Sequence, residues 1–417
     1  MASKKAKIVV VTSVLPDEIK YSNDVPVIPD KETRLDALDD FNHPRIRRVH
    51  ILRAFQQKYS DSMTFVKPSD PTTTDDAIGT SPCDRIVSYY KSTQSEDLLI
   101  FLTEAWKKWV ELGDSGRDPM TSLSKNEEKT NVSKNSNIPA LVPGNVPLPR
   151  DPHQIPSRNV MGQIGYYCTD TCTPIFGELV TELLWDAATI HHAMDLLLLP
   201  KGDEQRPKAV YALPTHPGHH AAKDSFGGYC YLNQAAHAAK LFLDSCPSIS
   251  KVAVLDVDYH CGNGTASIFY DNPNVLVVSI HCHPDHDYPF HSGFAEENDK
   301  APALCHIPLL PGATWDDDYK AALTQGVNTI RDFGAQALVV SLGLDTLEGD
   351  PVTLRRAGFR LQKSPDYWEM GSLIGSTLDK DIPCLFIQEG GYKMNELGEA
   401  AADVVAGFVS KRDDDII

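Results

Sequence analysis

The sequence has no long hydrophobic run, no CxxC cysteine pair and no excess of positive charge. A membrane-spanning helix requires about 20 consecutive apolar residues, and the apolar runs here are far shorter, so we expect no membrane contact. The nine cysteines form no CxxC pair, which predicts free thiols in a reducing compartment rather than a disulfide framework. With 39 basic against 57 acidic residues, the formal net charge is −18. This charge argues against direct nucleic-acid binding and favours cationic ligands.

The N-terminal segment also lacks the features of a secretory signal. Its short apolar run ends at Pro16 and Asp17 without a cleavage pattern of small residues, which favours a buried β-strand. We therefore expect a cytoplasmic and/or nuclear protein that is not secreted.

Short, β-branched apolar runs alternate along the chain with helix-length amphipathic stretches. The runs have the length and composition of parallel strands buried on both faces, and they lie at 7–12, 209–213, 252–256, 274–281, 337–342 and 384–388. The amphipathic stretches lie at 96–112, 178–199, 233–244, 319–332 and 367–378. This alternation predicts an α/β fold with a doubly wound, mostly parallel sheet flanked by helices.

One long polar segment interrupts the alternation. Residues 113–163 are rich in proline, serine and asparagine, and such a composition cannot bury enough apolar surface to offset the entropy of ordering. We interpret 113–163 as a partly flexible insertion within a single domain that spans 1–417.

The stretch VLDVDYHCGNGT places metal-binding side chains directly after an apolar run. If the strand continues past Leu255, Asp256, Asp258 and His260 share one face. Asp345 follows another apolar run, at the same end of a parallel sheet. Any one of these residues alone is more typical of a strand-end cap, but together Asp258, His260 and Asp345 predict a catalytic zinc site with an open position.

Two further strand ends carry candidate catalytic side chains. His219 and His220 follow a Pro-Gly turn in THPGHHA, and histidine is the usual residue for proton transfer near neutral pH. In FIQEGGYKM, the paired glycines allow an unusual backbone that would aim Tyr392 at a developing oxyanion.

Taken together, the motifs PGHHA, DVDYHCGNGT, GLDTLEGDP and EGGY resemble those of the zinc-dependent histone deacetylase and acetylpolyamine amidohydrolase superfamily. GYYCTDTCTPI, Asn263 and LEGDP are closer to the class II and acetylpolyamine branch. The resemblance covers residues 165–392 and implies an arginase-like α/β fold that hydrolyses acetamides of lysine or polyamines.

The resemblance also implies roles for individual residues. Asp258, His260 and Asp345 match the zinc ligands, and Tyr392 matches the tyrosine that polarises the substrate carbonyl. His220 resembles the general base, with His219 as its partner, held by Asp256. The substrate tunnel would be lined by Gly228, Tyr229, Tyr288, His291 and Val352. Asp256 and Ser279 match a structural potassium site.

Several positions depart from the family pattern. Val352 stands where polyamine-selective eukaryotic members carry a glutamate, which weakens that form of polyamine specificity. Asn263 stands where class I members carry an aspartate, so we expect the pKa of His220 to be less raised. Cys261 places a thiol beside the zinc ligands; we interpret it as a packing residue, with metal- or redox-linked reactivity as the alternative.

These observations favour a zinc-dependent lysine deacetylase that acts on acetylated proteins or peptides, histone tails among them. An acetylpolyamine amidohydrolase is the first alternative, and a weakly active acyl-lysine reader or scaffold is the second. A two-metal ureohydrolase would need a further carboxylate where Leu347 stands.

Overall fold

The computed structural model describes residues 8–22, 25–27, 44–59, 63–72, 81–114, 140–143, 155–200, 202–203 and 205–412. The strands are β1 (Ile8–Thr12), β2 (Lys20–Ser22), β3 (Val25–Val27), β4 (Met63–Val66), β5 (Ala209–Leu213), β6 (Val252–Asp256), β7 (Val275–Cys282), β8 (Leu304–Leu309), β9 (Ala337–Leu342) and β10 (Cys384–Gln388). The α-helices are α1 (Pro44–Tyr59), α2 (Pro82–Tyr90), α3 (Glu96–Asp114), α4 (Val160–Tyr167), α5 (Leu179–Leu197), α6 (Gln234–Ser245), α7 (Asn263–Ile268), α8 (Lys320–Phe333), α9 (Asp366–Gly375) and α10 (Leu397–Arg412).

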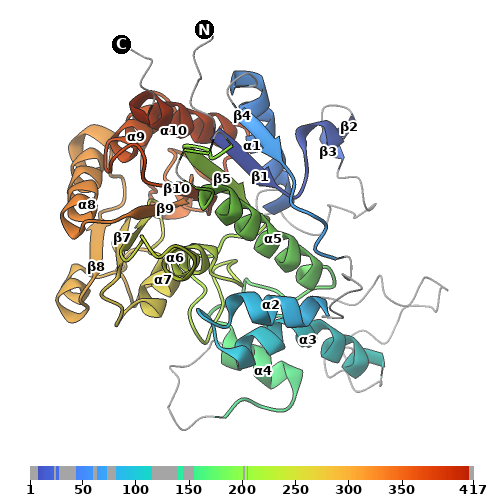
Figure 1. Cartoon of the computed structure of the whole chain (residues 1–417). Coiled ribbons are helices and arrows are strands. Elements are labelled where there is room, and N and C mark those ends of the chain that lie inside the picture. Colours follow the sequence, from blue (N-terminus) through green and yellow to red (C-terminus); the bar gives the residue numbers. More distant parts are fainter. Residues whose placement is uncertain are drawn as a thin grey trace.

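An eight-stranded sheet forms the centre of the molecule (Figure 1). Its strand order is β4-β1-β5-β10-β9-β6-β7-β8, and every neighbouring pair is parallel. The six apolar runs identified in the sequence became β1, β5, β6, β7, β9 and β10. Their continuous burial reflects helices on both faces of the sheet. The predicted fold class is confirmed.

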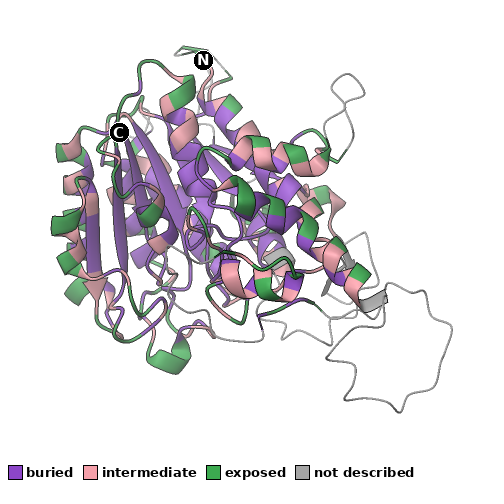
Figure 2. Ribbon diagram, turned by 90° about the horizontal axis from the view of Figure 1, so that it is seen from below, coloured by how far each residue is buried: buried purple, intermediate pink, exposed green. Residues whose placement is uncertain are grey.

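Helices cover both faces of this sheet. One hydrophobic cluster joins alternate strand residues to α1, α8, α9 and α10, and the other joins the remaining strand residues to α5 and α6. In Figure 2 the strands are buried between helices whose outer faces are exposed. This two-sided burial leaves the ends of the strands as the place where polar side chains can gather.

A third hydrophobic cluster lies beside the sheet, where α2, α3 and α4 pack on the first half of α5 (Figure 1). Phe226 and Tyr231, from the long loop after β5, belong to this cluster and are buried. Their rings stack on each other at 5.6 Å. The loop that carries His219, His220 and Tyr229 is therefore anchored between two parts of the core.

Local sequence signals explain several helix starts. Ser81 caps α2 by accepting a hydrogen bond from the Asp84 amide, and Pro82 takes the first helical position. Asn233 caps α6 by accepting a hydrogen bond of 2.8 Å from the Ala236 amide. These short polar side chains satisfy amides that have no partner within the helix.

The proline-rich stretch lies mostly outside the described residues. Its first two residues belong to the end of α3, and Val160 to Gln163 lie in α4. The partly flexible insertion over 113–163 stays a prediction. A single domain over 1–417 stays a prediction. Across the part of the chain that the structure describes, no helix has the length and apolar character needed to cross a membrane.

Candidate active site

The carboxyl ends of β5, β10, β9 and β6 lie next to one another along the sheet. Because the strands are parallel, the loops that follow them meet at one edge. These loops carry the histidine pair, the EGGY tyrosine, Asp345, and the acidic stretch after β6, and together they line a pocket of about 640 Å³. Predicted site residues from four distant parts of the sequence thus line one cavity.

Asp258, His260 and Asp345 form a candidate metal-binding group. Their ligand atoms all lie within 4.8 Å of one another. The Nδ1 atom of His260 is 3.4 Å from Asp258 Oδ1 and 3.2 Å from Asp345 Oδ2. A Cβ atom at Gly390 would lie 2.5 Å from carboxylate oxygens of both aspartates, so glycine is needed beside them. Two carboxylates and one imidazole fit the donor set of a catalytic zinc site.

The chain reaches this arrangement by bends rather than by an extended strand. β6 ends at Asp256, so the extended conformation that would place Asp256, Asp258 and His260 on one face does not reach the last two. The Asp258 amide donates to Asp256 Oδ1 at 3.1 Å, and the His260 amide donates to Asp258 Oδ1 at 2.9 Å. Val257 and Tyr259 still point into the hydrophobic core. Hydrogen bonds that the carboxylates accept from backbone amides therefore replace the strand ladder and keep the alternate residues on the pocket side.

Negative charge is concentrated at this group. Burial, and next the charge of Asp258, raise the pKa of Asp345 to about 7. Burial also acts to raise the pKa of Asp258, but the positive charge of His219 and the bonds from His260 outweigh it and hold that pKa below its usual range. A divalent cation between the two carboxylates would remove their mutual repulsion.

The two tandem histidines have different partners. His219 Nδ1 is 3.0 Å from Asp256 Oδ2, and His220 Nδ1 is 2.8 Å from Asn263 Oδ1. Burial lowers the pKa of His219, but the charges of Asp256 and Asp258 outweigh burial and raise it to about 10. Burial, and next the charge of His219, lower the pKa of His220 well below its ordinary value. With Asn263 as its partner, His220 was expected to have a pKa that is raised less than in class I members. In the structure its pKa is lowered instead.

Tyr392 also lines the pocket and is 7% exposed. Gly391 before it has a φ of 118°, a conformation that favours glycine. The Tyr392 amide donates to Asp350 Oδ2 at 2.7 Å, and the guanidinium of Arg47 lies 5.7 Å from the tyrosine ring centroid. Backbone conformation and these contacts together aim the phenol into the pocket.

Aromatic rings form the walls of the pocket. The Tyr288 ring lies 4.8 Å from the His220 ring, and the Tyr229 ring lies 6.2 Å from that of Tyr392, both in edge-to-face geometry. Gly228 and Val352 also line the pocket. His291 is exposed and is not among the lining residues, so the structure leaves it outside the predicted tunnel.

Asp256 and Ser279 are direct neighbours across β6 and β7 and are both fully buried. Ser279 Oγ lies 2.8 Å from His281 Nδ1. The potassium site at Asp256 and Ser279 stays a prediction.

Three supporting residues were not identified from the sequence. Glu389 accepts hydrogen bonds from the Gly218 amide at 2.6 Å and from the Ser341 hydroxyl at 3.0 Å, and it thereby holds the histidine loop against β9. Asp170 accepts from the Gly228 amide and lines the pocket. Glu389 lies in the EGGY motif and Asp170 in GYYCTDTCTPI, so their place in these motifs could have identified them. Arg47, in α1, is far from Tyr392 in the sequence and belongs to no motif.

The chain is similar to known proteins over most of its length. A family model described as "Histone deacetylase domain" matches residues 41–408. Acetylpolyamine amidohydrolase 2 of Pseudomonas aeruginosa is 36% identical over 322 residues, which is 76% of this chain and 81% of the relative. Histone deacetylase 8 of Arabidopsis thaliana is 32% identical over 231 residues, which is 54% of this chain and 59% of that protein.

A solved structure shares the fold. The acetylpolyamine aminohydrolase from Burkholderia pseudomallei superposes with a TM-score of 0.67 at 24% identity, and the match covers 96% of this chain and 98% of the other. From the extent of the family match and the identity to these relatives, the chain belongs to the histone deacetylase family of hydrolases.

Proposed function

We propose that this protein hydrolyses the acetamide of acetylated amines and that acetylpolyamines are its preferred substrates. The hydrolysis rests on one observation: a metal-type ligand triad, a histidine pair and Tyr392 line the same pocket. The substrate class rests on similarity to acetylpolyamine amidohydrolases over 76% of the chain, and the formal net charge of −18 favours a cationic substrate. The sequence alone favoured acetyl-lysine in proteins as the substrate. The extent of the similarity to acetylpolyamine amidohydrolases now favours acetylpolyamines.

The donor set of Asp258, His260 and Asp345 fits zinc. When bound there, zinc would polarise the acetyl carbonyl and lower the pKa of a water molecule. His220 takes the proton from the attacking water. Because its Nδ1 faces the Asn263 side-chain oxygen, an acceptor, Nδ1 carries a proton and Nε2 remains the basic atom. A histidine then returns the proton to the departing nitrogen.

Tyr392 stabilises the charge that develops on the acetyl oxygen. Its phenol remains protonated because burial raises its pKa well above the ordinary value, so the hydroxyl can donate a hydrogen bond throughout the reaction. Tyr229 and Tyr288 enclose the methylene chain of the substrate. Their rings provide apolar contact while the pocket mouth stays open to solvent for the rest of the amine.

A competition experiment tests the proposal. Zinc-loaded protein is offered equal amounts of acetylated spermidine and an acetyl-lysine peptide, and loss of acetyl is followed by mass spectrometry. We expect spermidine to be deacetylated preferentially. Tyr392→Phe should remain folded and lose activity by roughly 10²- to 10³-fold, since it lacks one oxyanion donor. Preference for the peptide would refute the polyamine assignment but not the hydrolysis.

Protein lysine deacetylation is the second candidate, and two arginines favour it. Arg355 and Arg356 line the pocket, and Arg356 is ion-paired with Asp287. Positive charge at the mouth would repel the free amines of a polyamine but not a neutral peptide backbone. Arg355→Gln should raise kcat/KM for acetylated spermidine and leave that for an uncharged acetyl-lysine amide unchanged. An acyl-lysine reader would bind either ligand without turnover.

A further inference from the structure

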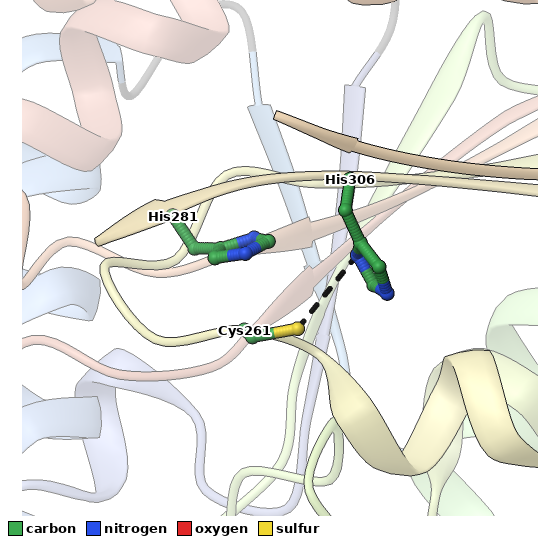
Figure 3. A group of neighbouring side chains, drawn as sticks. All are labelled: Cys261, His281 and His306. Carbon is green, nitrogen blue, oxygen red and sulfur yellow. Dashed lines mark hydrogen bonds between the residues drawn. The ribbon is translucent and has the colours of Figure 1, made fainter. Parts of the chain in front are cut away.

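Beside the candidate active site, a second group of metal-type side chains is buried under the outer strands. Cys261 directly follows His260, His281 lies in β7, and His306 lies in β8. All three are buried, with exposed fractions of 0, 0 and 2%. In Figure 3 the thiol and the two imidazoles point toward one another. One ligand atom from each lies within 4.8 Å of the others.

The spacing fits a shared metal ion. The Cys261 Sγ atom is 3.8 Å from His306 Nδ1. Typical zinc bonds to sulfur and nitrogen, at a tetrahedral angle, put those two atoms roughly 3.6 Å apart. A thiol and two imidazoles form a donor set that selects zinc and similar thiophilic ions over magnesium or calcium.

The outer sides of both rings are also arranged as they are in metal-bound histidines. His281 Nε2 lies 2.8 Å from the Gly293 carbonyl. Because a carbonyl only accepts, Nε2 carries the proton and Nδ1 keeps the lone pair. His306 Nε2 is buried without a hydrogen-bond partner in the described part of the chain, 3.7 Å from Glu297 Oε2. A carboxylate or carbonyl behind the ring typically orients a ligand histidine.

Backbone contacts close around the group. A Cβ atom at Gly293 would lie 2.6 Å from His281 Nε2 and 2.9 Å from Cys261 Sγ. Ser279 Oγ lies 2.8 Å from His281 Nδ1. With a metal ion bound, the hydroxyl would either rotate away from this nitrogen or provide its oxygen as a fourth ligand. The group has no place for substrate, which indicates a structural rather than a catalytic ion.

We propose that Cys261, His281 and His306 bind a second, structural zinc ion, separate from the ion of the catalytic triad. Binding releases the thiol proton and ties the loop after β6 to β7 and β8. The ion would thereby brace the segment that carries His260 against the edge of the sheet.

Cobalt substitution tests the proposal without relying on activity. Metal-free protein is loaded with Co²⁺, its metal content is measured, and its near-ultraviolet absorption is recorded. We expect two cobalt ions per chain and a thiolate-to-cobalt charge-transfer band. Asp258, His260 and Asp345 include no sulfur, so the band cannot come from the catalytic triad. A second thiol, Cys230, lies with His219 and Glu389, and Cys261→Ser distinguishes the proposed site from that group. Asp258→Ala should lose one ion and keep the band.

Variants of the group supply the reverse result. Cys261→Ser and His306→Asn should each bind one cobalt ion; Cys261→Ser should lose the band, and His306→Asn should lose or strongly weaken it. Cys305→Ser, which removes the neighbouring thiol of β8, should keep both ions and the band. A wild-type protein with one cobalt ion and no band, or a band that survives Cys261→Ser, would overturn the proposal. Absence of the band from the wild-type and Asp258→Ala spectra would refute the proposal even if the other variants did not fold.

Discussion

At the scale of single residues, Gly228 shows how closely the pocket is built. Its φ is 57°, and a Cβ atom there would lie 2.2 Å from the His220 ring. We expect Gly228→Ala to displace His220 and lower kcat/KM by about 100-fold, since misplacing a reacting group by about 1 Å costs that much. Deacetylation kinetics with an acetylated amine measure the effect.

Gly312 provides the matched control for this substitution. Its φ is 83°, but no other atom of the described residues lies within 4 Å of the position that a Cβ atom would take. Gly312→Ala therefore adds the same backbone strain, about 1–2 kcal/mol, without a clash near the pocket. If both variants lost activity equally, backbone strain rather than displacement of His220 would be the cause.

At the scale of elements, α9 and α10 cross at glycines. A Cβ atom at Gly407 would lie 1.9 Å from the Trp368 carbonyl oxygen, and one at Gly371 would lie 1.9 Å from the Val404 oxygen. Gly407→Ala should force the helices apart and lower the free energy of unfolding by about 1–3 kcal/mol or more. Urea denaturation measures the loss. Ala406→Ser, one residue earlier on a half-buried face, should change the midpoint little; equal losses would show that the crossing is not the cause.

The packing of α2, α5 and α6 depends on an uncharged His237. Its Nε2 is 2.9 Å from His191 Nε2, and its ring stacks on Tyr90 at 4.4 Å. Burial, and next the charge of His191, lower the pKa of His237 to about 3. A histidine in the unfolded chain has a pKa of about 6.5. Between about pH 3 and 6.5 the unfolded chain therefore binds more protons at this residue than the folded protein does. Stability should be full above this range and fall as the pH decreases through it.

Replacing this ring tests the pH dependence. His237→Phe keeps a ring against Tyr90 and removes the titration, so the free energy of unfolding should fall less steeply below pH 6.5, by up to about 1.4 kcal/mol per pH unit. Denaturation at several pH values measures the slope. His286→Gln, at an exposed position, should retain the wild-type slope. A slope unchanged in His237→Phe would show that other groups cause the acid sensitivity.

At the scale of the whole molecule, the net charge of −18 should attract a cationic substrate over distances longer than any contact. The Debye length shortens from about 30 Å at 0.01 M salt to about 3 Å at 1 M. We expect kcat/KM for acetylated spermidine to fall on the order of 10-fold over that range. An uncharged acetyl-lysine amide, measured in parallel, should show little change. Equal salt dependence of the two substrates would contradict long-range attraction.

Much of the fold followed from the sequence because its signals are local. Strands buried on both faces must be continuously apolar, and β5, β6, β9 and β10 have the predicted boundaries. The outer strands β4 and β8 lacked this signal, since Met63–Val66 and Leu304–Leu309 are only partly buried. α1 and α10 were not predicted either, although they cover one face of the sheet.

The same division applies to the site. The sequence by itself determined the ligand types at strand ends, because motif residues such as Asp258 and His260 are close in the chain and parallel strands end at one edge. Only the tertiary structure decided that Arg47 lies against Tyr392 and that Cys261 meets His306. These partners are far apart in sequence, and which strands become neighbours depends on how all the helices pack on the sheet. No local pattern carries that information.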